Sequence, residues 1–144
     1  KRQLNRLKEI AQAEQSNGQA LIEEPRFRDK ISRAEIELMA LEYTELRAVS
    51  AANQGRVPGT EVNLLKIRGS EMQQKISELL IEAIGYYANP FVPDSFDAGW
   101  NEEPIGPDYA AALAPEYFNW RKSSIYAGSN EIQKNIISKM VLGL

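Results

Sequence analysis

Apolar residues recur every three or four positions over most of the 144-residue chain, a spacing that predicts α-helices. The first stretch, Lys1–Glu14, has the pattern of the end of a helix, and Ser16-Asn17-Gly18 supplies its stop signal. The linker Gln19–Arg28 follows. A second helix is expected from about Asp29, its N-cap, to Asn53.

The second helix carries two neighbouring apolar stripes, so we expect it to pack on two sides, as an inner helix of a bundle does. One stripe is Ile31, Ala34, Leu38, Leu41, Ala48 and Ala52, and the other is Ile36, Met39, Tyr43 and Leu46.

A third helix is expected to begin at a Thr60-Glu61 cap and to run to about Tyr87, with the most regular spacing in the chain. Its apolar positions are Leu65, Gly69, Met72, Ile76, Leu79, Ala83 and Tyr86. Gly69 costs about 1 kcal/mol of helix propensity relative to Ala. We therefore expect a neighbouring helix to approach closely at that position.

The segment Asn89–Pro115 contains five of the seven prolines and reads as a long loop that is functional or wraps a neighbour. A short helix, Glu116–Ser124, and a final helix, Ser129–Leu142, are expected after it. The final helix should turn its apolar residues inward, namely Ile132, Ile136, Ile137, Met140 and Val141.

Together these elements predict an all-α fold, because no stretch alternates as a β-strand does and no segment repeats. We expect one domain over residues 1–144, an antiparallel up-down four-helix bundle with a long Pro-rich insertion before the last helices. The chain starts at Lys1 and not at Met, which suggests a piece of a longer protein.

The amino-acid composition excludes several kinds of catalytic and binding site. Lys and Arg number 17 against 20 Asp and Glu, a net charge of −3, so no basic surplus points to nucleic acid. The sequence has no Cys and no His, which excludes disulfides, thiolate nucleophiles, Cys/His zinc sites and imidazole catalysis. No apolar run is long enough to span a bilayer, and a cytoplasmic location is expected.

The most informative segment is Tyr126–Gln133, where a glycine-bearing turn leads directly into a helix whose expected N-cap is Ser129. The first amides of a helix have no partner within it, and the helix dipole places partial positive charge there. Such an end accepts an anion, and Gly128 lets a ligand approach the backbone. An ordinary helix cap with no ligand is the alternative interpretation.

The residues Ile125–Ile137 (IYAGSNEIQKNII), with the closing Val141–Leu144, resemble the carboxy-terminal signature of acyl-CoA dehydrogenases. The helix pair Asp29–Asn53 and Glu61–Tyr87 is similar to the two core helices of that family's C-terminal bundle. The resemblance implies a domain of a flavoenzyme. Such enzymes use FAD to remove two hydrogens from the α and β carbons of an acyl-CoA and pass the electrons to an electron-transfer flavoprotein. A homodimer or homotetramer is expected.

The resemblance also implies roles for individual residues. Ser129, Asn130 and Glu131 fall where the family contacts FAD, whereas Tyr126 and Gly128 border the place where thioester and flavin meet. A further glycine, Gly85, resembles the glycine turn that meets the FAD of a partner subunit.

The chain departs from the family pattern in three places. Ala127 stands where many members have the Glu base, so the base is expected upstream of Lys1, as in isovaleryl-CoA dehydrogenase, and no catalytic residue is expected in this chain. The Arg-x-x-Phe-Gly motif is missing, because Arg26-Phe27 lies out of register and the aligned stretch is Gly18–Ile22. The segment Asn89–Pro115 is longer than in typical members.

Other interpretations stay open. An acyl-CoA oxidase would share the fold and pass electrons to oxygen, and a helical oligomerisation module would bind no cofactor. Glu42 and Glu45 could share a helix face as in di-metal bundles, but those sites use a Glu-x-x-His element, so a solvated face and no metal are expected.

Two further groups of residues have a functional and a plain interpretation. A basic cluster is expected to be the exposed side of a helix end or, less simply, a contact to CoA phosphates, and it consists of Lys1, Arg2, Arg6 and Lys8. Four aromatic residues could line a cofactor pocket or serve as packing anchors, namely Trp100, Trp120, Tyr86 and Tyr87.

Overall fold

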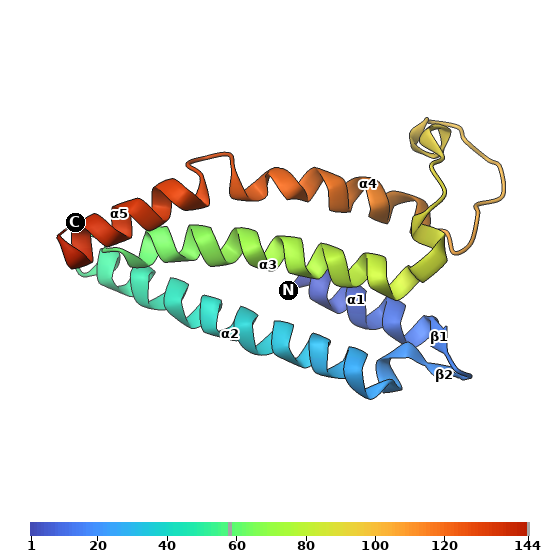
Figure 1. Cartoon of the computed structure of the whole chain (residues 1–144), viewed down its shortest axis with the longest axis horizontal. Coiled ribbons are helices and arrows are strands. Elements are labelled where there is room, and N and C mark those ends of the chain that lie inside the picture. Colours follow the sequence, from blue (N-terminus) through green and yellow to red (C-terminus); the bar gives the residue numbers. More distant parts are fainter. Residues whose placement is uncertain (58, 144) are drawn as a thin grey trace.

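The computed structural model describes residues 1–57 and 59–143, which form α-helices and one small hairpin (Figure 1). The helices are α1 (Arg2–Ala13), α2 (Pro25–Asn53), α3 (Glu61–Ile84), α4 (Ala110–Trp120) and α5 (Asn130–Leu142). The all-α class is confirmed. The hairpin was not expected and consists of β1 (Gln15–Ser16) and β2 (Gln19–Ala20), paired antiparallel.

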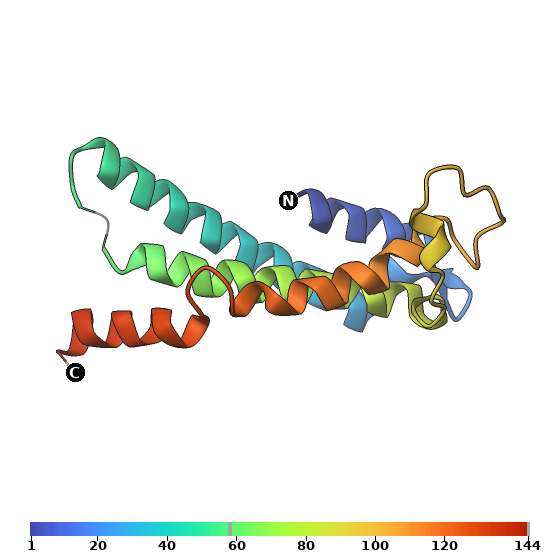
Figure 2. The same ribbon diagram turned by 90° about the horizontal axis from the view of Figure 1, so that it is seen from above.

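Helix α3 is the centre of the fold and contacts all four other helices. Helices α1 and α3 run in one direction, and α2, α4 and α5 run in the other, as the colour sequence in Figure 1 shows. Helices α4 and α5 follow one another along α3 (Figures 1 and 2). The C-terminal part of the chain that packs along α3 therefore consists of two helices joined by a turn.

Helix α2 begins four residues before its expected start at Asp29. Pro25 is its first residue, and the Glu24 carboxylate caps it by accepting the Phe27 N–H at 2.6 Å. Proline is favoured at this position because its ring fixes φ and its missing N–H would have no helical partner. Asp29 lies inside the helix and pairs with Arg33 at 2.9 Å, so its assignment as the cap was wrong.

The hydrophobic core fills the half of the molecule in which α1 and α4 flank the C-terminal half of α3. Its buried members are Leu4, Leu7, Ile10, Ala11, Phe27, Ile31, Ala34, Met72, Ile76, Leu79, Leu80, Ala83, Ile84, Ala110 and Leu113. None of them comes from α5.

Of the five apolar side chains of α5 that were expected to turn inward, only Ile137 is half-buried, and the other four are exposed. Ile132 is 53% exposed, and Met140 and Val141 are exposed further. The helix contacts α3 and has no described element on its other side to bury them. Tyr86, expected within the apolar stripe of α3, is 91% exposed because α3 ends at Ile84.

The close approach expected at Gly69 is absent, because a Cβ placed there would meet no heavy atom within 4 Å. Gly69 instead lines an open hollow of about 360 Å³ between α1, α2, α3 and α4, together with Leu38, Leu41, Met72 and Trp120.

The long connection after α3 is shorter than expected, because α4 already begins at Ala110 and contains Pro115. Four alanines and one leucine occupy residues 110–114 and favour the helix. Directly before α4, the Tyr109 hydroxyl donates to the Glu14 carboxylate at 2.6 Å. Burial and the neighbouring Glu14 raise the pKa of Tyr109.

Within residues 1–57 and 59–143, every helix is too short or too polar to cross a membrane.

We expect Tyr109→Phe to lower the free energy of unfolding by about 1 kcal/mol, the usual worth of one hydrogen bond. Urea denaturation measures it, with Tyr86→Phe at an exposed site as the control. The pKa of Tyr109 is raised above 10, the ordinary value of a phenol. The stabilisation by its hydrogen bond should therefore be fully present below pH 10 and should fall as the pH rises further. Equal stability of the Tyr109→Phe variant and the wild type at pH 7 would contradict this role.

Candidate functional site

The amino end of α5 has the cap that the sequence predicts. Ser129 is the N-cap, with extended backbone geometry, and its Oγ accepts the N–H of Ile132 at 3.4 Å. The Ser129 carbonyl accepts the N–H of Gln133 at 3.0 Å. The start of the last helix was therefore correctly read from the local sequence.

Asn130 points into the bundle. It is 5% exposed, and its Oδ1 accepts hydrogen bonds from Lys66 Nζ at 2.9 Å and from Ser70 Oγ at 3.1 Å. These contacts tie the first residue of α5 to α3. The side-chain oxygen of Asn130 is thus committed to the protein interior, and the expected contact of this residue with FAD remains a prediction.

Glu131 is exposed, and its carboxylate lies over the same helix end. Its pKa is lowered mainly by a hydrogen bond from its own backbone N–H, then by one from the Ser129 hydroxyl, and also by the charges of Lys134 and Lys66. Among the first-turn donors of α5, the Ile132 N–H already has a partner in Ser129 Oγ. A ligand oxygen that bound this N–H would have to replace that contact.

The turn before α5 is exposed and has unusual backbone geometry. Tyr126 is 47% exposed, and Ala127 and Gly128 have φ of +54° and +81°. A Cβ at Gly128 would lie 2.5 Å from Nε2 of Gln133, whose Oε1 accepts from Asn63 Nδ2 at 2.6 Å. The positive φ therefore favours glycine at position 128, and a larger residue there would have to displace the end of the Gln133 side chain.

The segment before the turn is fixed by a second group of hydrogen bonds from α3. Gln74 Nε2 donates to the Arg121 carbonyl at 3.0 Å and to the hydroxyls of Ser123 and Ser124 at 3.3 and 3.2 Å. In return, Arg121 Nη2 donates to the Gln74 carbonyl at 2.8 Å and to Ser77 Oγ at 3.1 Å. Both ends of the turn are therefore held on α3.

Gly85 follows the C-terminal end of α3, whereas the turn lies beside the N-terminal half of that helix (Figure 1). It is exposed, ends the helix with φ of +53°, and has open space around it. Within one chain, the structure does not bring Gly85 together with Ser129 and Glu131. The expected role of Gly85 at a partner subunit's FAD stays a prediction.

Several members of the acidic and basic clusters form ion pairs. Glu42 pairs with Lys1, Lys8 pairs with Glu35, and Arg6 lies 3.4 Å from Glu116. In residues 1–57 and 59–143, no group of three or more acidic side chains could hold a metal ion.

The aromatic residues of the sequence analysis lie in separate places. Trp120 Nε1 donates to Glu116 at 3.4 Å beside α1. Trp100 and Tyr87 line a hollow of about 80 Å³ beneath the long loop. The four aromatic residues therefore do not form one shared pocket.

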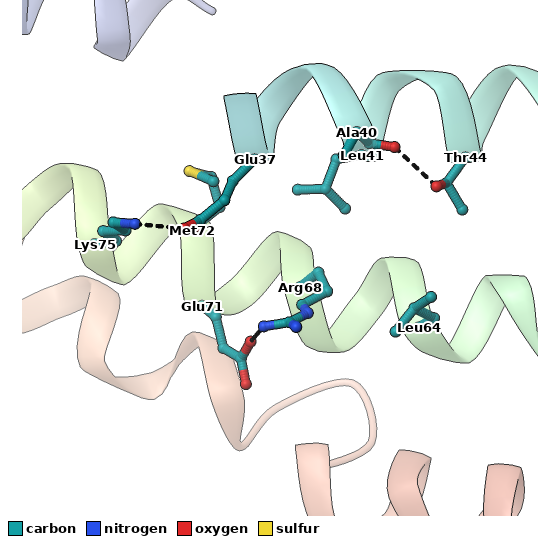
Figure 3. A pocket seen from close by; sticks show the side chains of 9 residues that line it. All are labelled: Glu37, Ala40, Leu41, Thr44, Leu64, Arg68, Glu71, Met72 and Lys75. Atoms are coloured by element: carbon teal, nitrogen blue, oxygen red, sulfur yellow. Dashed lines mark hydrogen bonds and ion pairs between the residues drawn. The ribbon is translucent and has the colours of Figure 1, made fainter. Parts of the chain in front are cut away.

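A hollow of about 330 Å³ lies between α2 and α3, and Figure 3 shows the side chains that line it. Its charged groups are used by one another, because Lys75 pairs with Glu37 at 2.7 Å and Arg68 pairs with Glu71 at 3.1 Å. Figure 3 shows these pairs along the walls, and the side chains do not converge on a common point. The hollow is therefore a surface groove whose charged groups are already paired with one another.

Sequence reasoning missed the polar residues of α3 that hold the turn, chiefly Lys66, Ser70 and Gln74. They follow one another at intervals of four residues, so they share one helix face. This spacing was visible beside the apolar stripe and is the signal that could have identified a polar face turned toward a neighbour.

The profile of the family described as "Acyl-CoA dehydrogenase, C-terminal domain" matches residues 1–142. Acyl-CoA dehydrogenase IpdE1 of Mycobacterium tuberculosis is 29% identical over 149 residues, covering 99% of this chain and 32% of the relative. The chain belongs to this family.

Solved structures show the same fold. A structure described as the FAD complex of PigA has a TM-score of 0.76 and 24% identity, covering 99% of this chain and 32% of that one. A glutaryl-coenzyme A dehydrogenase in complex with glutaryl-CoA has a TM-score of 0.74 and 19% identity, covering 98% and 31%. The chain spans about a third of the length of each of these proteins.

We expect Gly128→Ala to destabilise the protein by about 1 kcal/mol more than Gly55→Ala. Both alanines meet a positive φ, but only the one at position 128 displaces Gln133 and breaks its hydrogen bond with Asn63. Thermal unfolding of the two variants measures the difference. In an Asn63→Ala background the difference should shrink, and an unchanged difference there would contradict the explanation.

Proposed function

We propose that this chain is the C-terminal domain of an FAD-dependent acyl-CoA dehydrogenase that introduces an α,β double bond into an acyl-CoA thioester. The observation that carries the proposal is the segment Ile125–Ile137. Its residues match the family signature, and it forms an exposed turn before a capped helix end. Electrons would leave the complete enzyme through an electron-transfer flavoprotein.

Some of the residues at this turn have groups that could bind a flavin, and others are already engaged within the protein. The hydroxyl of Ser129 and the carboxylate of Glu131 are at the surface end of α5, next to the side-chain-free backbone of Gly128. Ser129 and Glu131 would both contribute oxygens to FAD from this helix end. Asn130 would contribute through its backbone, because its side-chain oxygen is engaged with Lys66 and Ser70.

The reacting end of the substrate would lie at the turn itself. Tyr126 and Gly128 would border the thioester, and Ala127 between them has no group that can accept a proton. We therefore propose that a carboxylate outside this chain takes the α proton. FAD, when bound, supplies the acceptor for the β hydride.

The same domain would form much of an oligomer interface. Four large apolar residues of α2 are spaced three and four apart and are more than half exposed, namely Ile36, Met39, Tyr43 and Leu46. This spacing produces the seam by which two helices pack together. We propose that a second copy covers it in a homodimer or homotetramer.

The flavin proposal is tested on the complete protein by adding FAD, removing free flavin, and titrating acyl-CoAs anaerobically. We expect bound flavin absorbance that is bleached by an acyl-CoA and restored by an electron-transfer flavoprotein. Faster restoration by oxygen would indicate an oxidase, and a protein that retains no flavin would contradict the proposal.

Ser129→Ala should weaken FAD binding about tenfold, the effect of losing one hydrogen bond to a charged ligand. Flavin fluorescence titration measures the Kd. Ser129→Thr keeps both hydroxyl and cap and should bind nearly as well as wild type. Ser138→Ala, on the same helix but away from its amino end, is the matched control. Equal Kd values for wild type and Ser129→Ala would remove this residue from the flavin site.

Met39→Glu should reduce the molar mass of the complete protein measured by light scattering, because it places a charge in the centre of the apolar seam. Ala52→Glu adds the same charge to another face of α2, also at an exposed position, and should leave the mass unchanged. An oligomer that survives Met39→Glu would show that the seam serves another purpose.

A further inference from the structure

Helix α3 carries a row of polar side chains along the face that it turns to residues 121–133. The members are Asn63, Lys66, Ser70, Gln74 and Ser77, spaced three, four, four and three residues apart. Each of them exchanges a hydrogen bond with that segment. We name this row the α3 polar row.

Lys66 has a special place in the α3 polar row because it joins the two ends of the exposed turn. Its ammonium donates to the Ser123 carbonyl at 3.1 Å, before the turn, and to Asn130 Oδ1 at 2.9 Å, after it. Between these two acceptors, Ser124 is held by Gln74 at 3.2 Å, whereas Ile125 to Gly128 are all exposed. Lys66 thus closes the base of the loop formed by residues 124–129.

The contacts of Lys66 differ from those of Lys8, Lys30 and Lys75, which pair with carboxylates. Its ammonium instead donates to two neutral oxygens from different parts of the C-terminal segment. Lys66 has no carboxylate within 4.0 Å among the described residues, and it is half-buried against neutral oxygens. The side chain therefore connects two segments of the chain and does not serve a single ion pair.

We propose that Lys66 is a positioning residue for the flavin-contacting loop. This inference rests on the proposed function. Lys66 holds the Ser123 and Asn130 ends of the loop at a fixed separation, so Ser129 and Glu131 meet the cofactor with their geometry already set. A loop that is ordered before binding loses less entropy on binding and therefore binds more tightly.

The charge of Lys66 also reaches the helix end. It is the smallest of the influences that lower the pKa of Glu131, after the hydrogen bonds at the helix end and the charge of Lys134. A neutral residue at position 66 would remove both the bridge and this influence. An arginine would keep the charge and has enough donors to reach both oxygens.

The test compares Lys66→Met, Lys66→Arg and the matched control Lys75→Met in the complete protein. Lys75 lies on the same helix and makes one ion pair with Glu37, away from the loop. We expect Lys66→Met to raise the Kd for FAD about tenfold or more. Lys66→Arg should restore most of the affinity, and Lys75→Met should bind as wild type does. If Lys66→Met fails to fold, Lys66→Gln replaces it, because glutamine is neutral and too short to bridge both acceptors.

Amide hydrogen exchange of residues 124–132 in the absence of FAD gives a readout that does not depend on the cofactor. Faster exchange in Lys66→Met than in wild type and Lys75→Met would support the bridge. Equal exchange in all three proteins would overturn it, as would an unchanged Kd for FAD. A wild-type protein that binds no flavin would overturn the proposed function, and the exchange data would still decide whether Lys66 orders the loop.

Discussion

The arrangement of the molecule depends on the two faces of α3. One face is apolar, with Met72, Ile76 and Leu79, and packs against α1, α2 and α4. The other is the α3 polar row, which hydrogen-bonds to residues 121–133. Burial of apolar area is non-directional and leaves the exact placement of a neighbour open, whereas hydrogen bonds need defined distances and angles. The core therefore holds the helices together, and the polar row fixes the C-terminal segment in one position.

This division explains why an exposed turn has a defined shape. Ala127 and Gly128 adopt left-handed backbone geometry, which costs free energy for alanine and is maintained only when the flanking residues are held. Arg121 and Gln74 hold one flank, and Asn130 holds the other. A turn supported in this way can present backbone and side-chain groups to a ligand with little reorganisation.

The apolar surface of the domain is unevenly covered. The end that contains α1 has a well-formed core, whereas the α2 seam and much of α5 remain exposed in the single chain. Isolated domains seldom expose so many large apolar residues, and such faces mark contacts with other parts of a protein or with other subunits. The chain spans about a third of its relatives, and the proposed assembly would cover these faces.

The sequence by itself determined the features that depend on neighbours in the chain: the all-α class, the Glu61 start of α3, the Ser129 cap, and the family signature. Tertiary structure decided the features that depend on distant residues. Asn130 turns inward because Lys66 and Ser70 donate hydrogen bonds to its side-chain oxygen. Gly69 faces a hollow because no neighbouring helix reaches it. Periodicity defines which residues share a helix face, but which partner that face meets depends on contacts between residues far apart in the chain.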